Sequence, residues 1–119
     1  MKTSQNGIAA ILADEGERLT AYFDIVGVPT ISVGVTDGVT ADDVRNKRTI
    51  TREESQAMFA IALAPRESAV ERLCTLKPTQ NQFDAMVSLC YNIGPSNFEK
   101  STVLRAFNAG KLDRKSTRL

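Results

Sequence analysis

The sequence predicts an α+β fold that is predominantly helical, with one small β-hairpin region followed by a helical lobe. Apolar residues recur at helical spacing in several stretches, one stretch alternates with a period of two, and turn-forming residues separate these segments. The chain has 119 residues, of which 42% are hydrophobic and 24% are charged. This balance is typical of one soluble globular domain.

The first expected element is a helix over residues 4–14, where apolar side chains recur at i, i+3 and i+4. A β-hairpin follows, in which residues 21–25 pair with residues 30–36 across a turn at residues 26–29. The second strand alternates apolar and small polar residues, which predicts one buried face and one polar face. The polar residues of that strand are Thr30, Ser32, Gly34 and Thr36.

Residues 37–50 are polar and rich in turn formers, which predicts a loop. Thr51 and Glu54 then form a capping-box pattern at the start of a helix. Pro65 is expected to kink or restart that helix, because proline has no N–H group for helical hydrogen bonding.

A second capping-box pattern, at Thr79 and Gln82, precedes the most regular helical spacing in the chain. Its apolar residues are Phe83, Met86, Val87, Cys90 and Tyr91. Gly94 followed by a proline is expected to end this helix. A last helix is expected over residues 101–109, beginning at a serine and closing at a glycine.

Histidine and tryptophan are absent from the sequence. Without histidine there is no Ser-His-Asp or Cys-His pair and no histidine-ligated zinc site. Acid–base chemistry therefore falls on carboxylates, lysine, tyrosine or cysteine. Cys74 and Cys90 lie 16 residues apart with no C-x-x-C pattern, so we expect small buried apolar residues and no disulfide framework. We expect neither a metal site nor an organic cofactor.

The positive charge is concentrated at one end of the chain. Residues 100–119 carry six basic side chains and one acidic side chain, although the net charge of the chain is +1. A solvated terminal segment is the favoured interpretation, and docking to an anionic polymer, such as nucleic acid or an acidic cell-wall glycan, is the alternative. The sequence has no recognition-helix signature, so we expect no nucleic-acid partner. We also expect no signal peptide and no membrane insertion.

Two carboxylates and a hydroxyl fall where the first helix meets the hairpin. Glu15 lies at the end of that helix, Asp24 lies beside the hairpin turn, and Thr30 begins the second strand on its polar face. A helix end that faces the front of a hairpin would direct these groups into a cleft. Glycoside hydrolysis requires two carboxyl groups in unlike environments.

The residues around these groups resemble the active-site segment of the phage-type lysozymes, muramidase endolysins of glycoside hydrolase family 24. That family pattern reads E-G-x-x-L-x-A-Y-x-D-x-x-G-x-x-T-I-G, and residues 15–31 match it in all but the final glycine. Residues 79–94 are similar to the family's T-x-x-Q-x-x-A-L-V-S-x-x-[FY]-N-x-G helix, and residues 101–110 to its S-T-L-L…N-A-G segment. The resemblance implies a lysozyme-like fold with an active-site cleft.

The resemblance also implies roles for individual residues. Glu15 would be the general acid on the glycosidic oxygen, and Asp24 and Thr30 would hold and activate the attacking water in an inverting reaction. The separation of the two carboxyl groups distinguishes the outcomes, at about 6.5–9.5 Å for inversion and about 5–5.5 Å for retention. Candidates for lining the sugar groove are Tyr22, Ser32, Tyr91 and Asn92, although Tyr91 is equally compatible with a place in the core.

The chain departs from the family pattern at three places. Val35 stands where the family has a histidine, and Ser32 stands where it has a glycine. The family continues past the N-A-G segment into further helices, whereas residues 113–119 have no apolar periodicity. We therefore expect residues 1–112 to form a single lysozyme-like domain that is truncated at its C-terminal end, followed by an unstructured, artefactual tail.

The implied reaction is hydrolysis of the β-1,4 bond between N-acetylmuramic acid and N-acetylglucosamine in bacterial peptidoglycan, leading to host cell lysis. The alternative is an inactive, lysozyme-like fragment that binds peptidoglycan. By resemblance, the protein would be a monomer that accumulates in the host cytoplasm and depends on a holin for access to the wall.

Overall fold

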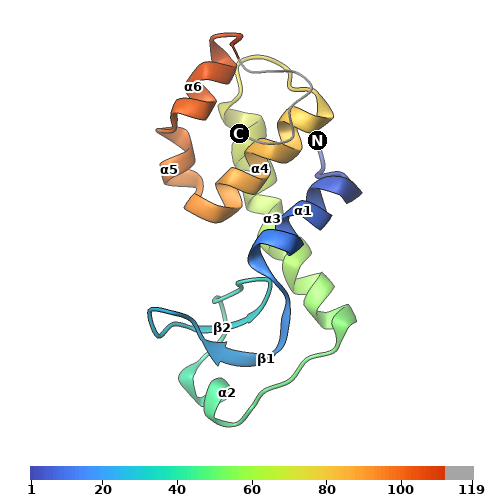
Figure 1. Cartoon of the computed structure of the whole chain (residues 1–119), viewed down its shortest axis with the longest axis vertical. Helices are drawn as coiled ribbons and strands as arrows, with labels where there is room; N and C mark the ends of the chain where they lie inside the picture. The colour runs from blue at the N-terminus through green and yellow to red at the C-terminus, as the bar shows by residue number, and fades with distance from the viewer. Residues whose placement is uncertain (112–119) are drawn as a thin grey trace. The chain divides into compact units, whose positions relative to one another are not determined.

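The computed structural model describes residues 1–111 and divides the chain into two compact units. We call Leu12–Ala62 the hairpin unit, and Met1–Ile11 together with the chain from Leu63 onward the helical unit. The element order, drawn in Figure 1, is α1 (Gln5–Glu15), β1 (Arg18–Phe23), β2 (Pro29–Ser32), α2 (Ala41–Arg45), α3 (Arg52–Leu73), α4 (Gln80–Ile93), α5 (Pro95–Glu99) and α6 (Thr102–Asn108). The prediction of a predominantly helical α+β fold is confirmed. The predicted segment 113–119 lies outside the described residues.

In the hairpin unit, β1 and β2 form a two-stranded antiparallel sheet, as predicted. Tyr22 lies opposite Thr30 and Arg18 lies opposite Ser32, with an irregularity in the register between these pairs. The core of this unit contains buried Ala21, Ile31 and Ile50. Partly buried Leu19, Val39, Val44 and Met58 pack against them.

The predicted second strand is wrong in its length and in its polar face. β2 ends at Ser32 because the backbone turns there, with φ values of +61° at Ser32 and +66° at Gly34. Two backbone hydrogen bonds of 2.9 Å between Ile31 and Val35 close this turn. Thr30 and Ser32, on the predicted polar face, are both buried, as is Ile31. Ser32 is buried because its hydroxyl lies against Ser55 in the first turn of α3.

The loop predicted over residues 37–50 contains a short helix, α2. Thr40 accepts a hydrogen bond from the Asp43 N–H, and the Asp43 carboxylate accepts one from the Thr40 N–H. This is a capping box with aspartate in the usual place of glutamate. The helix packs against both strands of the hairpin.

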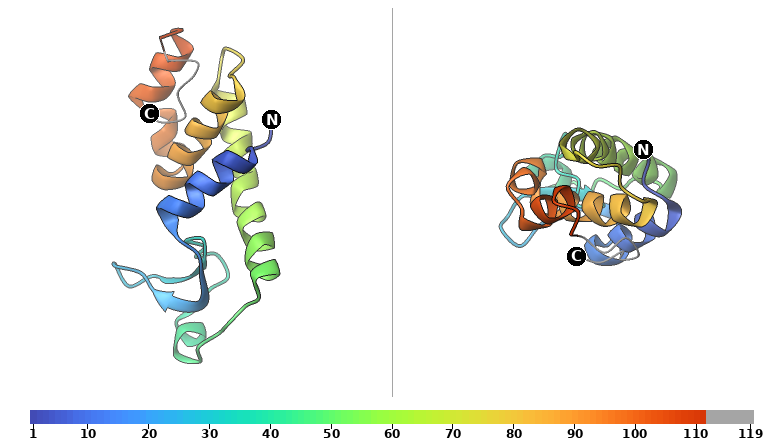
Figure 2. Two further views of the ribbon diagram at one scale, coloured as in Figure 1. Left: turned by 45° about the vertical axis from the view of Figure 1, so that its right-hand side comes forward. Right: turned by 90° about the horizontal axis from the view of Figure 1, so that it is seen from above.

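The long helix α3 begins at the predicted capping box, where the Glu54 carboxylate accepts the Thr51 N–H and the Thr51 hydroxyl accepts the Glu54 N–H. The expected restart at Pro65 is wrong, since α3 is one continuous helix of 22 residues that contains Pro65 (Figure 2). Proline removes one helical hydrogen bond, and the bonds on either side are enough to keep the helix continuous.

In the helical unit, the predicted capping box of Thr79 and Gln82 begins α4, and Gly94, at φ +87°, ends it. Four of its predicted apolar residues, Phe83, Met86, Val87 and Cys90, are fully buried. The short helix α5 was not predicted, and it lies between α4 and α6, which both contact it. Phe98, Leu104 and Phe107 complete this core.

Both cysteines are free. Cys90 is buried, whereas Cys74 is only partly buried and its thiol lies 3.9 Å from the Met86 sulfur. Burial raises the pKa of Cys74 to about 11. Both thiols therefore belong to the apolar packing of the helical unit.

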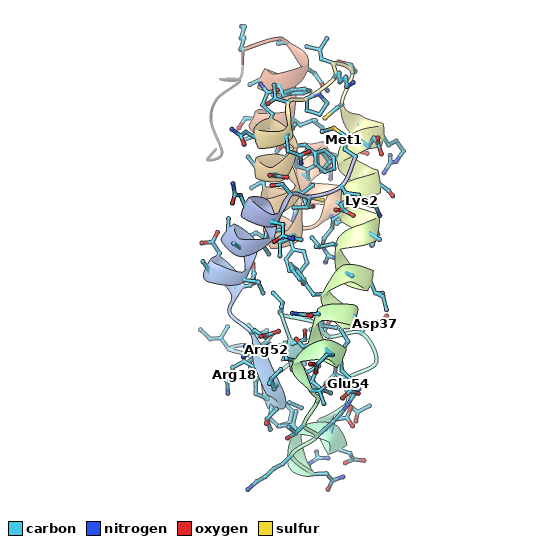
Figure 3. The ribbon with its side chains drawn as sticks, turned by 90° about the vertical axis from the view of Figure 1, so that its right-hand side faces the viewer. Met1, Lys2, Arg18, Asp37, Arg52 and Glu54 are labelled. Atoms are coloured by element: carbon cyan, nitrogen blue, oxygen red, sulfur yellow. The ribbon has the colours of Figure 1, made fainter. Side chains whose placement is uncertain are left out.

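Carboxylates hold the N-terminal residues of the helical unit in place. The α-amino group of Met1 lies 2.7 Å from Glu71, and the N–H and hydroxyl of Thr3 both donate to buried Glu67 at 2.7 Å. Figure 3 shows Met1 and Lys2 at this end of the chain. Among the described residues, no helix is long and apolar enough to cross a membrane.

Candidate active site

Glu15 is the last residue of α1, and its side chain is exposed. Gly16 follows with φ at +75°, a conformation that favours glycine and ends the helix. The Glu15 carboxylate lies beside Gly34, since a methyl group at Gly34 would be 3.6 Å from Oε2. The end of α1 thus meets the turn that follows β2.

Asp24 lies in the turn between the two strands and shapes it. Its Oδ1 accepts hydrogen bonds from the N–H groups of Val26 at 3.0 Å and Val28 at 2.8 Å. Its own N–H donates to the Val28 carbonyl at 2.9 Å. The carboxylate is therefore held at a defined place at the end of the hairpin.

Thr30 lies on β2 opposite Tyr22, and its side chain is buried. Its hydroxyl donates to the Val28 carbonyl at 2.7 Å. Asp24 and Thr30 therefore share Val28 as a hydrogen-bonding partner. The Asp24 carboxylate accepts the Val28 N–H, and the Val28 carbonyl accepts both the Asp24 N–H and the Thr30 hydroxyl. A hydroxyl that donates in this way keeps lone pairs free to accept a hydrogen bond from a bound molecule.

The groove candidates of the hairpin unit differ in exposure. Tyr22 is partly buried, and the Arg18 guanidinium lies 4.2 Å from the centre of its ring. Figure 3 shows Arg18 on β1 and Arg52 at the start of α3. Ser32 is fully buried, and its hydroxyl pairs with that of Ser55 at 2.6 Å.

The other two groove candidates, Tyr91 and Asn92, lie at the end of α4 and belong to the helical unit. Tyr91 is partly buried, and the Arg66 guanidinium lies 4.6 Å from the centre of its ring. Asn92 is exposed.

Sequence reasoning missed the polar contacts of Glu17, two residues after Glu15. The Ser55 hydroxyl donates to the Glu17 carboxylate at 2.7 Å, and the Glu17 carboxylate lies 3.6 Å from the Arg52 guanidinium. Glu17 occupies a variable position of the family pattern, and Ser55 lies 38 residues away in the sequence. No local pattern connects two residues so far apart.

The hairpin unit therefore contains two carboxylates in unlike surroundings and a hydroxyl near one of them. Glu15 is exposed at a helix end, whereas Asp24 accepts two backbone N–H groups. This set of groups is the one that acid–base hydrolysis of a glycosidic bond requires. Within residues 1–111, no cluster of three or more His, Cys, Asp or Glu side chains is suited to hold a metal ion.

The family model described as phage lysozyme matches residues 13–119. The chain belongs to the phage lysozyme family. The endolysin of Salmonella phage P22 is 45% identical over 108 residues, which cover 91% of this chain and 74% of that protein. The predicted family and the predicted lysozyme-type enzyme are thereby confirmed.

Solved structures of phage lysozyme relatives agree with this fold. A mutant of P22 lysozyme superposes with a TM-score of 0.81 at 39% identity, covering 100% of this chain and 90% of that one. The muramidase domain of SpmX from Asticaccaulis excentricus superposes with a TM-score of 0.82 at 36% identity, covering 92% of this chain and 71% of that domain.

Proposed function

We propose that this phage lysozyme family member hydrolyses the β-1,4 bond between N-acetylmuramic acid and N-acetylglucosamine in bacterial peptidoglycan. The observation that carries the proposal is the place of the Glu15 carboxylate against Gly34, in the same unit as the hairpin that bears Asp24 and Thr30. The endolysin and muramidase relatives support the choice of a cell-wall glycan as substrate.

In the proposed reaction, Glu15 donates a proton to the glycosidic oxygen as the bond from that oxygen to the anomeric carbon breaks. The Thr30 hydroxyl accepts a hydrogen bond from a water molecule, and the Asp24 carboxylate takes a proton from it. The water oxygen attacks the anomeric carbon from the opposite face of the sugar. The products are a free 4-hydroxyl group on one sugar and an anomeric hydroxyl of inverted configuration on the other.

Sugar-binding roles for Tyr22, Tyr91 and Asn92 are part of the proposal, because aromatic and amide side chains suit sugar rings and their hydroxyl groups. We further propose that the protein accumulates as a monomer in the host cytoplasm before lysis and gains access to the wall through a holin. We also propose that residues 1–112 form one lysozyme-like domain.

The Glu15→Gln variant tests the general acid. Glutamine preserves the size of the side chain and has no proton of suitable acidity, so the hydrolysis rate should fall by at least about a hundredfold. The measurement is release of reducing ends from purified peptidoglycan. Glu53→Gln, at an exposed residue in the first turn of α3, serves as a matched control and should retain the activity of the unmodified protein.

The Asp24→Asn variant distinguishes the role of Asp24 in the reaction from its role in holding the hairpin turn. The asparagine carbonyl can still accept the Val26 and Val28 N–H groups, so the fold should persist while hydrolysis is lost.

Equal activity in Glu15→Gln and the unmodified protein would refute the acid assignment. Sedimentation of the unmodified protein with peptidoglycan, without release of reducing ends, would instead support the binding fragment.

A further inference from the structure

A chain of hydrogen bonds links three segments of the hairpin unit. The Ser32 and Ser55 hydroxyls lie 2.6 Å apart, and the Ser32 hydroxyl also donates to the Ser55 carbonyl at 3.1 Å. The Ser55 hydroxyl donates to the Glu17 carboxylate at 2.7 Å. These bonds join the residue before β1, the end of β2 and the first turn of α3.

The chain has one direction. A carboxylate only accepts hydrogen bonds, so the single proton of the Ser55 hydroxyl is directed to Glu17. The Ser32 hydroxyl must then donate toward Ser55, where its single proton is shared between the Ser55 hydroxyl oxygen at 2.6 Å and the Ser55 carbonyl at 3.1 Å. Both serines are fully buried, so loss of one link leaves a polar group that water cannot readily satisfy.

The linked residues adjoin the proposed catalytic groups on both segments. Glu17 lies two residues after Glu15, and Ser32 lies two residues after Thr30. Ser32 also lies two residues before Gly34, which the Glu15 carboxylate approaches. Through Ser55, the segment that carries the acid and the segment that carries the water-holding hydroxyl are tied to the same turn of α3.

The backbone at Ser32 supports a role beyond packing. Its φ is +61°, in the left-handed region that glycine adopts without strain and other residues disfavour. A serine stands there, at the position where the family pattern has a glycine, and its hydroxyl is engaged in the chain of hydrogen bonds. Conformations of this kind are concentrated at functional sites.

We propose that Ser55 and Glu17 are positioning residues, which set the place of the Glu15 carboxylate relative to Thr30. The inference rests on the proposed muramidase function. A small displacement of an acid from its reacting oxygen slows catalysis strongly while substrate binding persists. Removal of either residue should therefore lower kcat and leave KM nearly unchanged.

The test compares kcat and KM of variants on a soluble peptidoglycan oligosaccharide. Ser55→Ala and Glu17→Ala should each lower kcat by about tenfold or more, with KM changed by less than about twofold. Glu17→Gln keeps a carbonyl that accepts the Ser55 hydroxyl, so it should recover most of the kcat lost in Glu17→Ala. The double variant should be no slower than the slower single variant, because both changes break the same link.

Ser32→Gly serves as a second probe if Ser55→Ala does not fold. Glycine accepts the left-handed backbone and leaves the bond from Ser55 to Glu17 intact, so kcat should fall less than in Glu17→Ala. Glu53→Ala is the matched control on the same turn of α3 and should match the unmodified protein.

Two outcomes separate this inference from the proposed function. If Glu15→Gln is inactive while Glu17→Ala, Ser55→Ala and Ser32→Gly all keep full kcat, the positioning role is wrong and the muramidase proposal stands. If Glu15→Gln keeps its activity, the acid assignment fails and the positioning role fails with it. If the unmodified protein releases no reducing ends from peptidoglycan, the proposed function itself fails. Equal loss in Glu17→Gln and Glu17→Ala would also overturn the hydrogen-bond argument.

Discussion

At the scale of single residues, Gly7 shows how closely the backbone of the helical unit is packed. The Asp84 carboxylate accepts hydrogen bonds from the Ser4 N–H at 3.0 Å, from the Ser4 hydroxyl and from the Gln80 side chain at 2.8 Å. It is therefore held in place beside α1. A methyl group at Gly7 would lie 2.6 Å from the Asp84 Cγ and 2.8 Å from the Thr3 Cγ2.

Gly7→Ala should destabilise the protein even though alanine favours helix. At 2.6 Å from the hydrogen-bonded Asp84 carboxylate, the added methyl group costs about 2–3 kcal/mol, the upper part of the range for overpacking. This exceeds the gain of about 1 kcal/mol in helix propensity. The free energy of unfolding, measured by urea titration, should fall accordingly. Asn6→Ala, at the exposed neighbouring position, should be neutral or slightly stabilising. A rise in stability for Gly7→Ala would contradict the packing argument.

At the scale of elements, capping boxes begin α2, α3 and α4. The sequence predicted the boxes at α3 and α4 because Thr-x-x-Glu and Thr-x-x-Gln are the usual patterns. The box at α2 has aspartate in the last position, and its helix has only five residues. That helix depends on packing against the hairpin, because so short a helix is not stable by itself.

The cap of α3 should make stability depend on pH in the acid range. Hydrogen bonds with Thr51 hold the pKa of Glu54 below its ordinary value of 4.5. The bond from the Thr51 N–H has the largest effect, and the Thr51 hydroxyl has the next largest. A lowered pKa contributes stability above about pH 4.5, and that contribution is lost as the pH falls through the folded value. The free energy of unfolding should therefore decrease on acidification below about pH 4.5.

Glu54→Gln isolates this contribution, because the glutamine carbonyl still caps Thr51 but does not ionise. Its stability should depend less on pH in the same window, as measured by urea titrations at a series of pH values. Asp43, whose pKa the Thr40 N–H also lowers, remains unchanged in this comparison. Superimposable pH profiles for the two proteins would refute the assignment.

At the scale of the whole molecule, charge separates a wall-acting protein from a nucleic-acid binder. The net charge is only +1, and the excess of basic residues lies at residues 100–119, where three of the six basic side chains belong to described residues. A chain with so small a net charge should contact few DNA phosphates, so its binding to DNA should be weak and should be lost as the salt concentration rises.

We expect any DNA binding to disappear between about 50 mM and about 200 mM salt. Fluorescence anisotropy of a labelled duplex measures it. Under the same conditions, the Glu15→Gln variant should still sediment with purified peptidoglycan, since binding of the glycan does not need the acid. Salt-resistant DNA binding, with no sedimentation, would favour the nucleic-acid hypothesis.

Local patterns carried much of the fold. The first helix, the starts of α3 and α4 and the glycine that ends α4 depend on residues within about four positions of one another. The hairpin depends on two short segments joined by one turn, so all of these features are visible in the sequence. The segment from Glu15 to Ile31 likewise identified the family. The same local information misjudged Ser32, whose polar character predicted an exposed face.

By itself, the sequence determined the helices, the hairpin, the family and the candidate acid, because each is written in short-range spacing. Only the tertiary structure decided that Ser32 is buried, that Ser55 bonds to Glu17 and that Asp84 lies against Gly7. Ser32 and Ser55 are 23 positions apart in the sequence, Glu17 and Ser55 are 38 apart, and Gly7 and Asp84 are 77 apart. Such pairs meet only when the elements pack, since no pattern of neighbouring residues specifies a partner so distant along the chain.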